Sequence, residues 1–245
     1  MKIDELKAYV VEFDLDIIYI TETWLNEEIS NSDVAIENVS MYKKDRWEVK
    51  GGRAGGVIVY VRESVILFPC EELNKYSTEF LWCKMMVDKE NVLTIGVCYN
   101  SPNSKDSEVN ELMDVIQKAS NNMVLIMREF NFPGINWVTL ETDATESKIS
   151  DLTQECFLTQ HVLKRTRYDN ILNLVLSSEE NMVEELFVLE HLANSDQNII
   201  TWKTTYETVI NPLDARSRYT GGTVYQRHHP KPVDRRHGYQ RKCYL

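Results

Sequence analysis

Residues 123–137 constrain the fold more than any other part of the chain. They read MVLIMREFNFPGINW, in which five apolar residues are followed by Arg128, Glu129 and Asn131. A short apolar run bounded by polar residues is typical of a strand that is buried on both faces. Glu129 and Asn131 would then lie just beyond the carboxyl end of a buried strand, where open α/β sheets bind their ligands.

Two other segments have the same form. Residues 16–24 are an apolar strand that ends on Glu22, and the polar run at residues 194–198 leads into a second apolar stretch at residues 199–202. Acids and amides at three separate strand ends are the groups that a divalent-metal hydrolase requires. The sequence therefore favours an enzyme of this kind.

Apolar periodicity predicts an α/β (α+β) domain with mixed sheets. Residues 3–13 have helical spacing and lead into a strand at 16–21. The remaining predicted helices are 108–119 and 148–158, and the remaining predicted strands are 57–61, 80–87, 92–99, 123–127, 171–176, 185–189 and 198–203. Strands that alternate with a few helices indicate sheets covered by helices.

Composition is compatible with one large domain and does not exclude a nuclease. The chain has 245 residues, of which 43% are hydrophobic, which is enough for a substantial core. Its net charge is −11, yet residues 213–245 carry eight Lys or Arg against two Asp. A metal-dependent nuclease can be acidic overall, because its phosphate contacts are local and its site is built of carboxylates.

The cysteines and the amino terminus indicate a reducing compartment. Five cysteines occur without a CxxC pair, which argues against both zinc binding and a disulfide framework. The first residues, MKIDELKAYVVEFD, contain no apolar stretch long enough for a signal peptide or a transmembrane segment. We expect a nuclear or cytoplasmic location and no membrane partner.

These segments, with the glycine run at 51–57 and the sequence at 96–103, resemble the endonuclease/exonuclease/phosphatase superfamily. The resemblance is strongest with the apurinic-endonuclease-like domain of non-LTR retrotransposons of the CR1 and jockey-like kind. It extends in order from about residue 2 to residue 203. It implies a DNase I-like, four-layer sandwich of two mixed β-sheets flanked by helices, and Mg²⁺-dependent hydrolysis of phosphodiesters in DNA.

The resemblance also implies roles for individual residues. Glu22 corresponds to a Mg²⁺ ligand, Tyr99 to a residue that contacts the scissile phosphate, and Asn131 to a residue that orients this phosphate. Arg53 lies beside the glycine run, where it either contacts phosphate or is a solvated turn residue.

The chain departs from the family at the catalytic motifs. The family motif Gly-Asp-Phe-Asn is replaced by a sequence with Glu129, and Ser-Asp-His by Ser195, Asp196 and Gln197. The histidine of that motif is regarded as the general base, and glutamine cannot accept a proton near neutral pH. An aspartate that orients the catalytic residues is replaced by Asn173.

These replacements predict very weak activity or none. Loss of a general base costs on the order of a hundredfold to ten-thousandfold in rate. Residues that act as a unit do not contribute additively, so the further replacements add little to that cost. Glu129 also places its carboxylate one methylene away from the position of the family aspartate.

The sequence predicts a domain at residues 1–210 and a separate basic tail at residues 211–245. The chain begins after the family's first strand, and loss of a strand would expose a sheet edge. The tail is rich in Arg, His, Tyr, Gly and Pro, so we expect it to be disordered. It is interpreted either as a terminal sequence without function, which we favour, or as an arm that contacts nucleic acid.

Three functions remain as alternatives. The chain is a retrotransposon endonuclease domain with an impaired site, a catalytically silent nucleic-acid-binding remnant, or an interaction protein without either activity. An inositol-lipid phosphatase is a weaker alternative, because the superfamily fold hosts it. His161 and His191 are interpreted as packing residues and not as replacements for the missing base.

Overall fold

The computed structural model describes residues 3–49, 51, 55–76, 79–88, 90–130, 134–139, 141–142, 147–191, 195, 197–205 and 241–244. The described part contains two six-stranded sheets. In spatial order, the first sheet contains β10 (Val183–His191), β11 (Asn198–Thr204), β12 (Arg241–Tyr244), β1 (Ile17–Thr21), β3 (Val57–Arg62) and β2 (Val39–Lys44). The second contains β4 (Leu67–Pro69), β5 (Phe80–Met86), β6 (Val92–Asn100), β7 (Val124–Phe130), β9 (Asn173–Ser177) and β8 (Thr159–Gln160).

Each sheet is mixed, with one parallel pair near its centre. In the first sheet β12 runs parallel to β1, and in the second β6 runs parallel to β7. The other described neighbours are antiparallel. The helices are α1 (Ile3–Glu12), α2 (Arg46–Val49), α3 (Glu71–Asn74), α4 (Asp106–Ala119) and α5 (Ser147–Glu155), with a 3-10 turn at Glu180–Met182.

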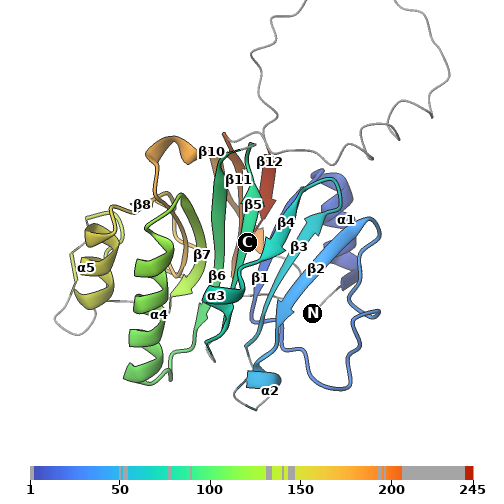
Figure 1. Ribbon diagram of the computed structural model, residues 1–245, viewed down its shortest axis with the longest axis horizontal. Coiled ribbons are helices and arrows are strands. Elements are labelled where there is room, and N and C mark those ends of the chain that lie inside the picture. Colours follow the sequence, from blue (N-terminus) through green and yellow to red (C-terminus); the bar gives the residue numbers. More distant parts are fainter. Residues whose placement is uncertain are drawn as a thin grey trace, which may run out of the picture.

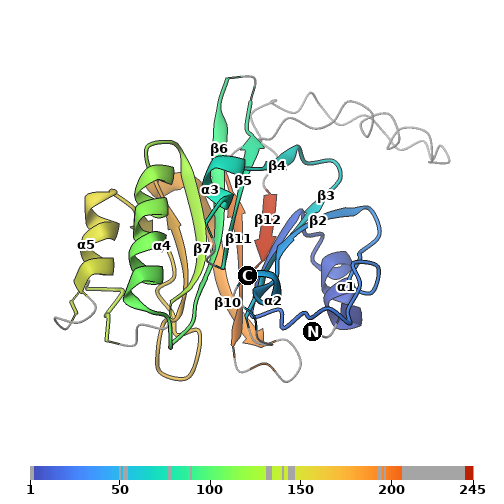
Figure 2. The same cartoon turned by 60° about the horizontal axis from the view of Figure 1, so that its bottom comes forward.

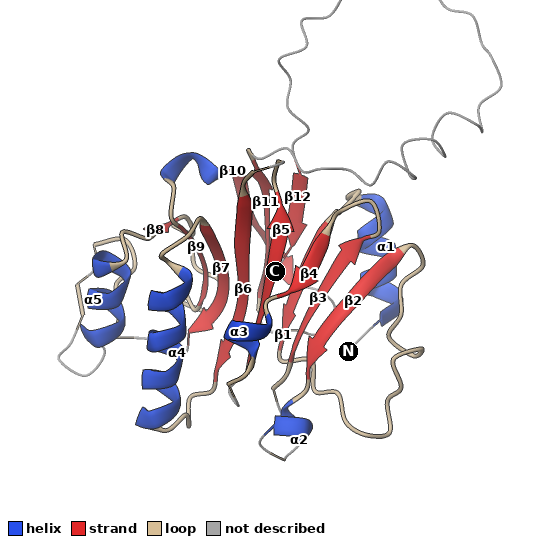
Figure 3. Cartoon of the chain, viewed as in Figure 1, coloured by secondary structure: helices blue, strands red, loops and turns tan. Residues whose placement is uncertain are grey.

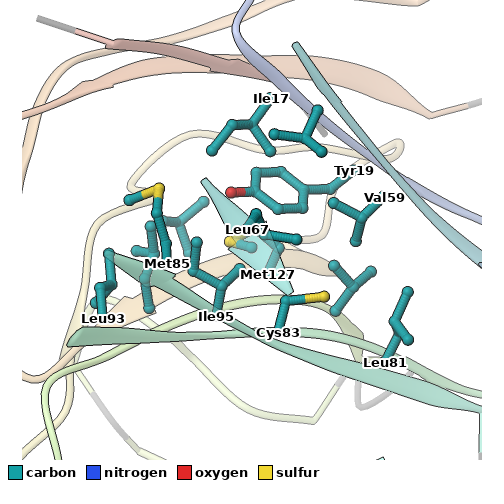
Figure 4. Close-up of a cluster of buried hydrophobic side chains, with 14 of the residues drawn as sticks. Ile17, Tyr19, Val59, Leu67, Leu81, Cys83, Met85, Leu93, Ile95 and Met127 are labelled. Carbon is teal, nitrogen blue, oxygen red and sulfur yellow. The ribbon is translucent and has the colours of Figure 1, made fainter. Parts of the chain in front are cut away.

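An apolar layer joins the two sheets. Ile17 and Tyr19 on β1 belong to the same buried cluster as Met85 on β5 and Met127 on β7 (Figure 4). The Tyr19 ring stacks on Trp202 of β11, with 5.8 Å between the ring centroids. Because alternate residues of a strand point to opposite faces, Ile17 and Tyr19 face the other sheet while Ile18 faces away.

Helices cover the outer faces of the sheets. On one side, Leu6 and Val10 of α1 share a buried cluster with Ile18. On the other, α4 and α5 pack on the second sheet through residues that include Leu112 and Leu152. Figures 1 and 3 show α1 on one side of the sheets and α4 and α5 on the other. None of the helices in the described part has both the length and the apolar character needed to cross a lipid bilayer.

The α/β class with mixed sheets is confirmed, and most predicted strands lie where the apolar pattern placed them. The pattern did not predict β2, β4, β8 or β12. Within the expected tail at residues 211–245, Arg241–Tyr244 form the strand β12, which pairs with both β1 and β11 (Figure 2). Residues 206–240 and 245 lie outside the described residues.

A close contact between β5 and β6 gives a test of this packing. Gly96 lies opposite Trp82, and a Cβ atom on Gly96 would lie only 2.5 Å from the Trp82 ring. Since Trp82 is fully buried, its indole has no free space to move into. We expect Gly96→Ala to lower the free energy of unfolding by about 1–3 kcal/mol, as measured by urea denaturation.

A double-mutant cycle supplies the control. In a Trp82→Leu background the same glycine substitution should cost much less, since the ring that it meets is gone. Equal costs in the two backgrounds would contradict the packing described here.

Candidate active site

Five of the predicted site residues converge where strands of the two sheets end. In the second sheet Tyr99 pairs with Glu129, and Glu129 pairs with Asn173. From the first sheet come Glu22, which follows β1, and Gln197, which precedes β11. Side chains from both sheets therefore meet at one end of the apolar layer.

Gln197 lies at the centre of this group. Its Nε2 atom donates to Oε1 of Glu129 at 2.6 Å and to Oε2 of Glu22 at 3.4 Å. Its Oε1 atom accepts a hydrogen bond from Nδ2 of Asn173 at 3.3 Å. The amide of Gln197 thus bridges the two carboxylates, and Asn173 fixes which way the amide faces.

Tyr99 completes the contacts of Glu22. Its hydroxyl donates to Oε1 of Glu22 at 2.6 Å. Burial, and then the hydrogen bond and charge of Glu22, raise the pKa of the Tyr99 phenol well above its ordinary value. Tyr99 therefore stays protonated and acts as a hydrogen-bond donor near neutral pH.

Glu129 is a buried acid beside a second acid. It is only 1% exposed, and the Thr21 hydroxyl donates to its Oε2 atom at 3.0 Å. Burial, followed by the charge of Glu22, raises the pKa of Glu129 to about 7, and the hydrogen bonds from Thr21 and Gln197 act in the opposite direction. The site therefore contains a carboxyl that changes its charge near neutral pH.

The backbone at Glu22 has an uncommon conformation. Glu22 has φ 51° and Trp24 has φ 55°, both in the left-handed region that side-chain-bearing residues seldom adopt. The backbone of this turn is held by the glycine run, since Trp24 N donates to the carbonyl of Gly55 at 2.9 Å. A Cβ atom on Gly56 would lie 2.5 Å from the Thr23 hydroxyl, so glycine is required there. Strain of this kind is concentrated at functional sites.

A buried ion pair, which the sequence did not reveal, supports the same region. The Glu79 carboxylate accepts hydrogen bonds from Gly56 N at 2.8 Å and from Nε of Arg46 at 2.8 Å. The Glu79 carbonyl accepts one from Tyr99 N at 2.9 Å, and the Arg46 guanidinium lies 5.8 Å from the Tyr99 ring centroid. Arg46 and Glu79 therefore link the glycine turn to the strand that carries Tyr99.

The other predicted residues do not belong to this group of five side chains. Arg53, Asn131 and Asp196 lie outside the described residues. The ring of His161 forms a hydrogen bond with the Ser177 hydroxyl, with 2.6 Å between Nε2 and Oγ. His191 is the last residue of β10.

A family model matches part of the chain. Residues 93–201 match a family model described as "Endonuclease-reverse transcriptase". That span contains Tyr99, Glu129, Asn173 and Gln197, whereas Glu22 lies before it. No match was found among curated proteins.

Solved structures show the fold. The endonuclease domain of TRAS1, a telomere-specific non-LTR retrotransposon, is similar with a TM-score of 0.64 and 14% identity, over 85% of this chain and 95% of that one. An endonuclease/exonuclease/phosphatase family protein from Bacteroides thetaiotaomicron has a TM-score of 0.55 and 13% identity, over 80% and 83% of the two chains. The chain has the endonuclease/exonuclease/phosphatase fold. A mannosyl-6-phosphatase from Bacteroides thetaiotaomicron shares it, with a TM-score of 0.52 and 13% identity over 80% and 88%.

The oxygen donors of this site fit Mg²⁺. The described residues contain no cluster of three or more His, Cys, Asp or Glu side chains placed to hold a metal. Mg²⁺ does not require such a cluster, because it keeps several waters and is commonly held by one or two carboxylates. Glu22 and Glu129 provide two carboxylates that lie close together, since the Gln197 amide donates to both.

The raised pKa of Glu129 predicts how stability depends on pH. Its ordinary value is 4.5 and its folded value is about 7, so between these values the folded chain retains a proton that the unfolded chain has released. The free energy of unfolding should therefore fall as the pH rises from about 4.5 to about 7, and the total loss should reach about 3 kcal/mol once the pH is above 7. Urea denaturation in the presence of EDTA at several pH values measures this slope.

Glu129→Gln is the matched control, because it cannot ionise. Burial lowers the pKa of His161 to about 4 from 6.5, which gives the opposite slope in part of the same window. The difference in stability between the parent and Glu129→Gln isolates the effect of Glu129. A difference that does not vary with pH would show that Glu129 does not titrate as described.

Proposed function

We propose that the chain is a retrotransposon-derived endonuclease-like domain, built as a four-layer DNase I-like sandwich, whose Mg²⁺-dependent hydrolysis of DNA phosphodiesters is impaired or lost. The observation that carries this proposal is the Gln197 amide, which bridges Glu22 and Glu129 and accepts from Asn173. The family-model match and the similarity to the TRAS1 endonuclease domain support the ancestry.

Glu22 and Glu129 would hold the metal ion. Bound Mg²⁺ would supply positive charge next to the phosphate that is attacked. The Tyr99 hydroxyl already donates to Glu22, so it would orient this carboxylate and lie beside the phosphate. Asn131 and Arg53 are proposed to contact the phosphate, and Asp196 to support Gln197.

Gln197 explains the loss of activity. The resemblance implies a histidine base oriented by an aspartate, whereas the structure has an amide–amide pair in which Asn173 donates to Gln197. Gln197 can orient a water molecule through its carbonyl or amino group, but it cannot accept the proton that the attacking water must lose. The loss of this step is expected to cost on the order of a hundredfold to ten-thousandfold in rate.

A second candidate function is nucleic-acid binding without hydrolysis. The concentration of Lys and Arg in residues 213–245 favours it, since phosphate contacts by these residues give sequence-independent affinity. Binding of the full chain to a DNA duplex that weakens steeply with added salt, and more than in a variant with Arg235 and Arg236 replaced by Gln, would support it.

Plasmid nicking tests the proposed endonuclease function. The parent chain is compared with a Gln197→His, Glu129→Asp, Asn173→Asp variant in the presence of Mg²⁺. We expect little or no nicking by the parent and a gain of at least about a hundredfold in the variant, because a base and its orienting acid are restored. Conversion of supercoiled plasmid to the open circular form is the readout.

Two controls define the outcome. Adding Glu22→Gln to the triple variant should abolish nicking, as should EDTA. Equal nicking by the parent and the variant would contradict the proposal that Gln197 disables the site, and silence from both would place the defect outside these three positions.

A further inference from the structure

The strand β12 occupies an unusual position for its place in the chain. It lies in the interior of the first sheet, with Cys243 opposite Ile17 of β1 and also opposite Trp202 of β11 (Figure 2). Among the described strands, β1 and β11 are joined through β12 and not directly to each other. Without β12, each of these two strands would present an unpaired edge within the sheet.

The second sheet shows how two parallel neighbouring strands are usually connected. There the parallel neighbours β6 and β7 are consecutive strands connected by α4, which is the usual strand–helix–strand unit. In the first sheet α1 leads into β1, and the parallel neighbour of β1 is β12, which comes from the far end of the sequence. In the described part of the chain, a distant segment thus supplies the parallel neighbour of β1.

The connection between β11 and β12 does not dictate this pairing. Antiparallel neighbours need a turn of only about two to five residues, whereas residues 205–240 separate these two strands. So long a connector imposes little direction on the strand that follows it. Recognition must therefore come from the acceptor edges of β1 and β11.

We propose that the space between β1 and β11 is a strand-acceptor site whose ligand is an extended peptide, supplied by residues 241–244 of the same chain. The backbone groups of β1 and β11 bind the peptide, parallel to one and antiparallel to the other. Because the segment is covalently linked to its acceptor site, its effective concentration there is on the order of millimolar, so the segment of the same chain outcompetes that of a second copy at lower protein concentrations.

The acceptor site also sets the spacing of the candidate active site. Glu22 follows β1 and Gln197 precedes β11, and these are the two strands that β12 joins. The bound peptide therefore keeps β1 and β11 separated by the width of one strand. The proposal concerns backbone pairing and stands whether or not the site hydrolyses DNA.

Disulfide trapping tests the pairing and identifies the occupant. Lys203 lies opposite Lys242 in the antiparallel β11–β12 pair, where Cα atoms are about 4.5–5.5 Å apart and a disulfide can form. In a full chain that carries Cys243→Ser, the Lys203→Cys, Lys242→Cys variant should form an intrachain disulfide on mild oxidation. Non-reducing electrophoresis and peptide mapping measure it.

Two comparisons make the trapping decisive. Lys203→Cys with Arg241→Cys is the matched control, because in the register of the pair position 241 lies opposite Thr204 and not opposite Lys203. Equal cross-linking in the two variants, or none in the first, would overturn the pairing. A mixture of the two single variants that gives mainly disulfide-linked dimers would overturn the choice of the same chain as occupant.

A stability measurement tests the pairing without added cysteines. Lys242→Pro removes a backbone donor from the middle of β12, whereas Lys242→Ala leaves the backbone intact. We expect a lower urea midpoint for the proline variant than for the alanine variant, together with faster amide exchange at Ile17, Ile18 and Trp202. Indistinguishable midpoints and exchange rates would overturn the proposal.

Discussion

The apolar layer between the two sheets is the interaction on which the rest of the structure depends. Tyr19, Trp202, Met85 and Met127 bring the sheets together face to face, so the strand ends of both sheets open onto the same region. Glu22 and Gln197 of the first sheet could not meet Tyr99, Glu129 and Asn173 of the second if the sheets were separated. The geometry of the site is thus a result of hydrophobic burial, and the hydrogen bonds within it refine an arrangement that packing has already imposed.

The site contains two acids, Glu22 and Glu129, and neutral side chains that donate hydrogen bonds to them. Glu22 and Glu129 would repel each other if both were ionised without a counterion, and the Gln197 amide donates to both. A neutral amide satisfies these carboxylates at any pH, whereas a histidine would change its charge between them. The Gln197 amide therefore stabilises this arrangement of the site, and it cannot carry a proton near neutral pH.

Sequence reasoning succeeded where a local pattern carries the information. β3, β6 and β7 are apolar runs, and the five converging residues stand beside such runs or within motifs that the family resemblance supplied. β2 and β12 contain lysine or arginine and little apolar periodicity, so their pairing is decided by the strands beside them. Arg46 and Glu79 were missed for a similar reason, since their burial as an ion pair depends on the glycine turn and on no sequence motif.

The position of β12 has a consequence for how the chain folds. Ile17 pairs with Cys243, so the contact closes a loop that includes nearly the whole sequence. During synthesis, the edges of β1 and β11 stay unpaired until residues 241–244 have left the ribosome. Contacts between such distant residues slow folding, and open edges pair readily with other chains. The yield of native protein should therefore depend on chaperones and on a low concentration of nascent chains.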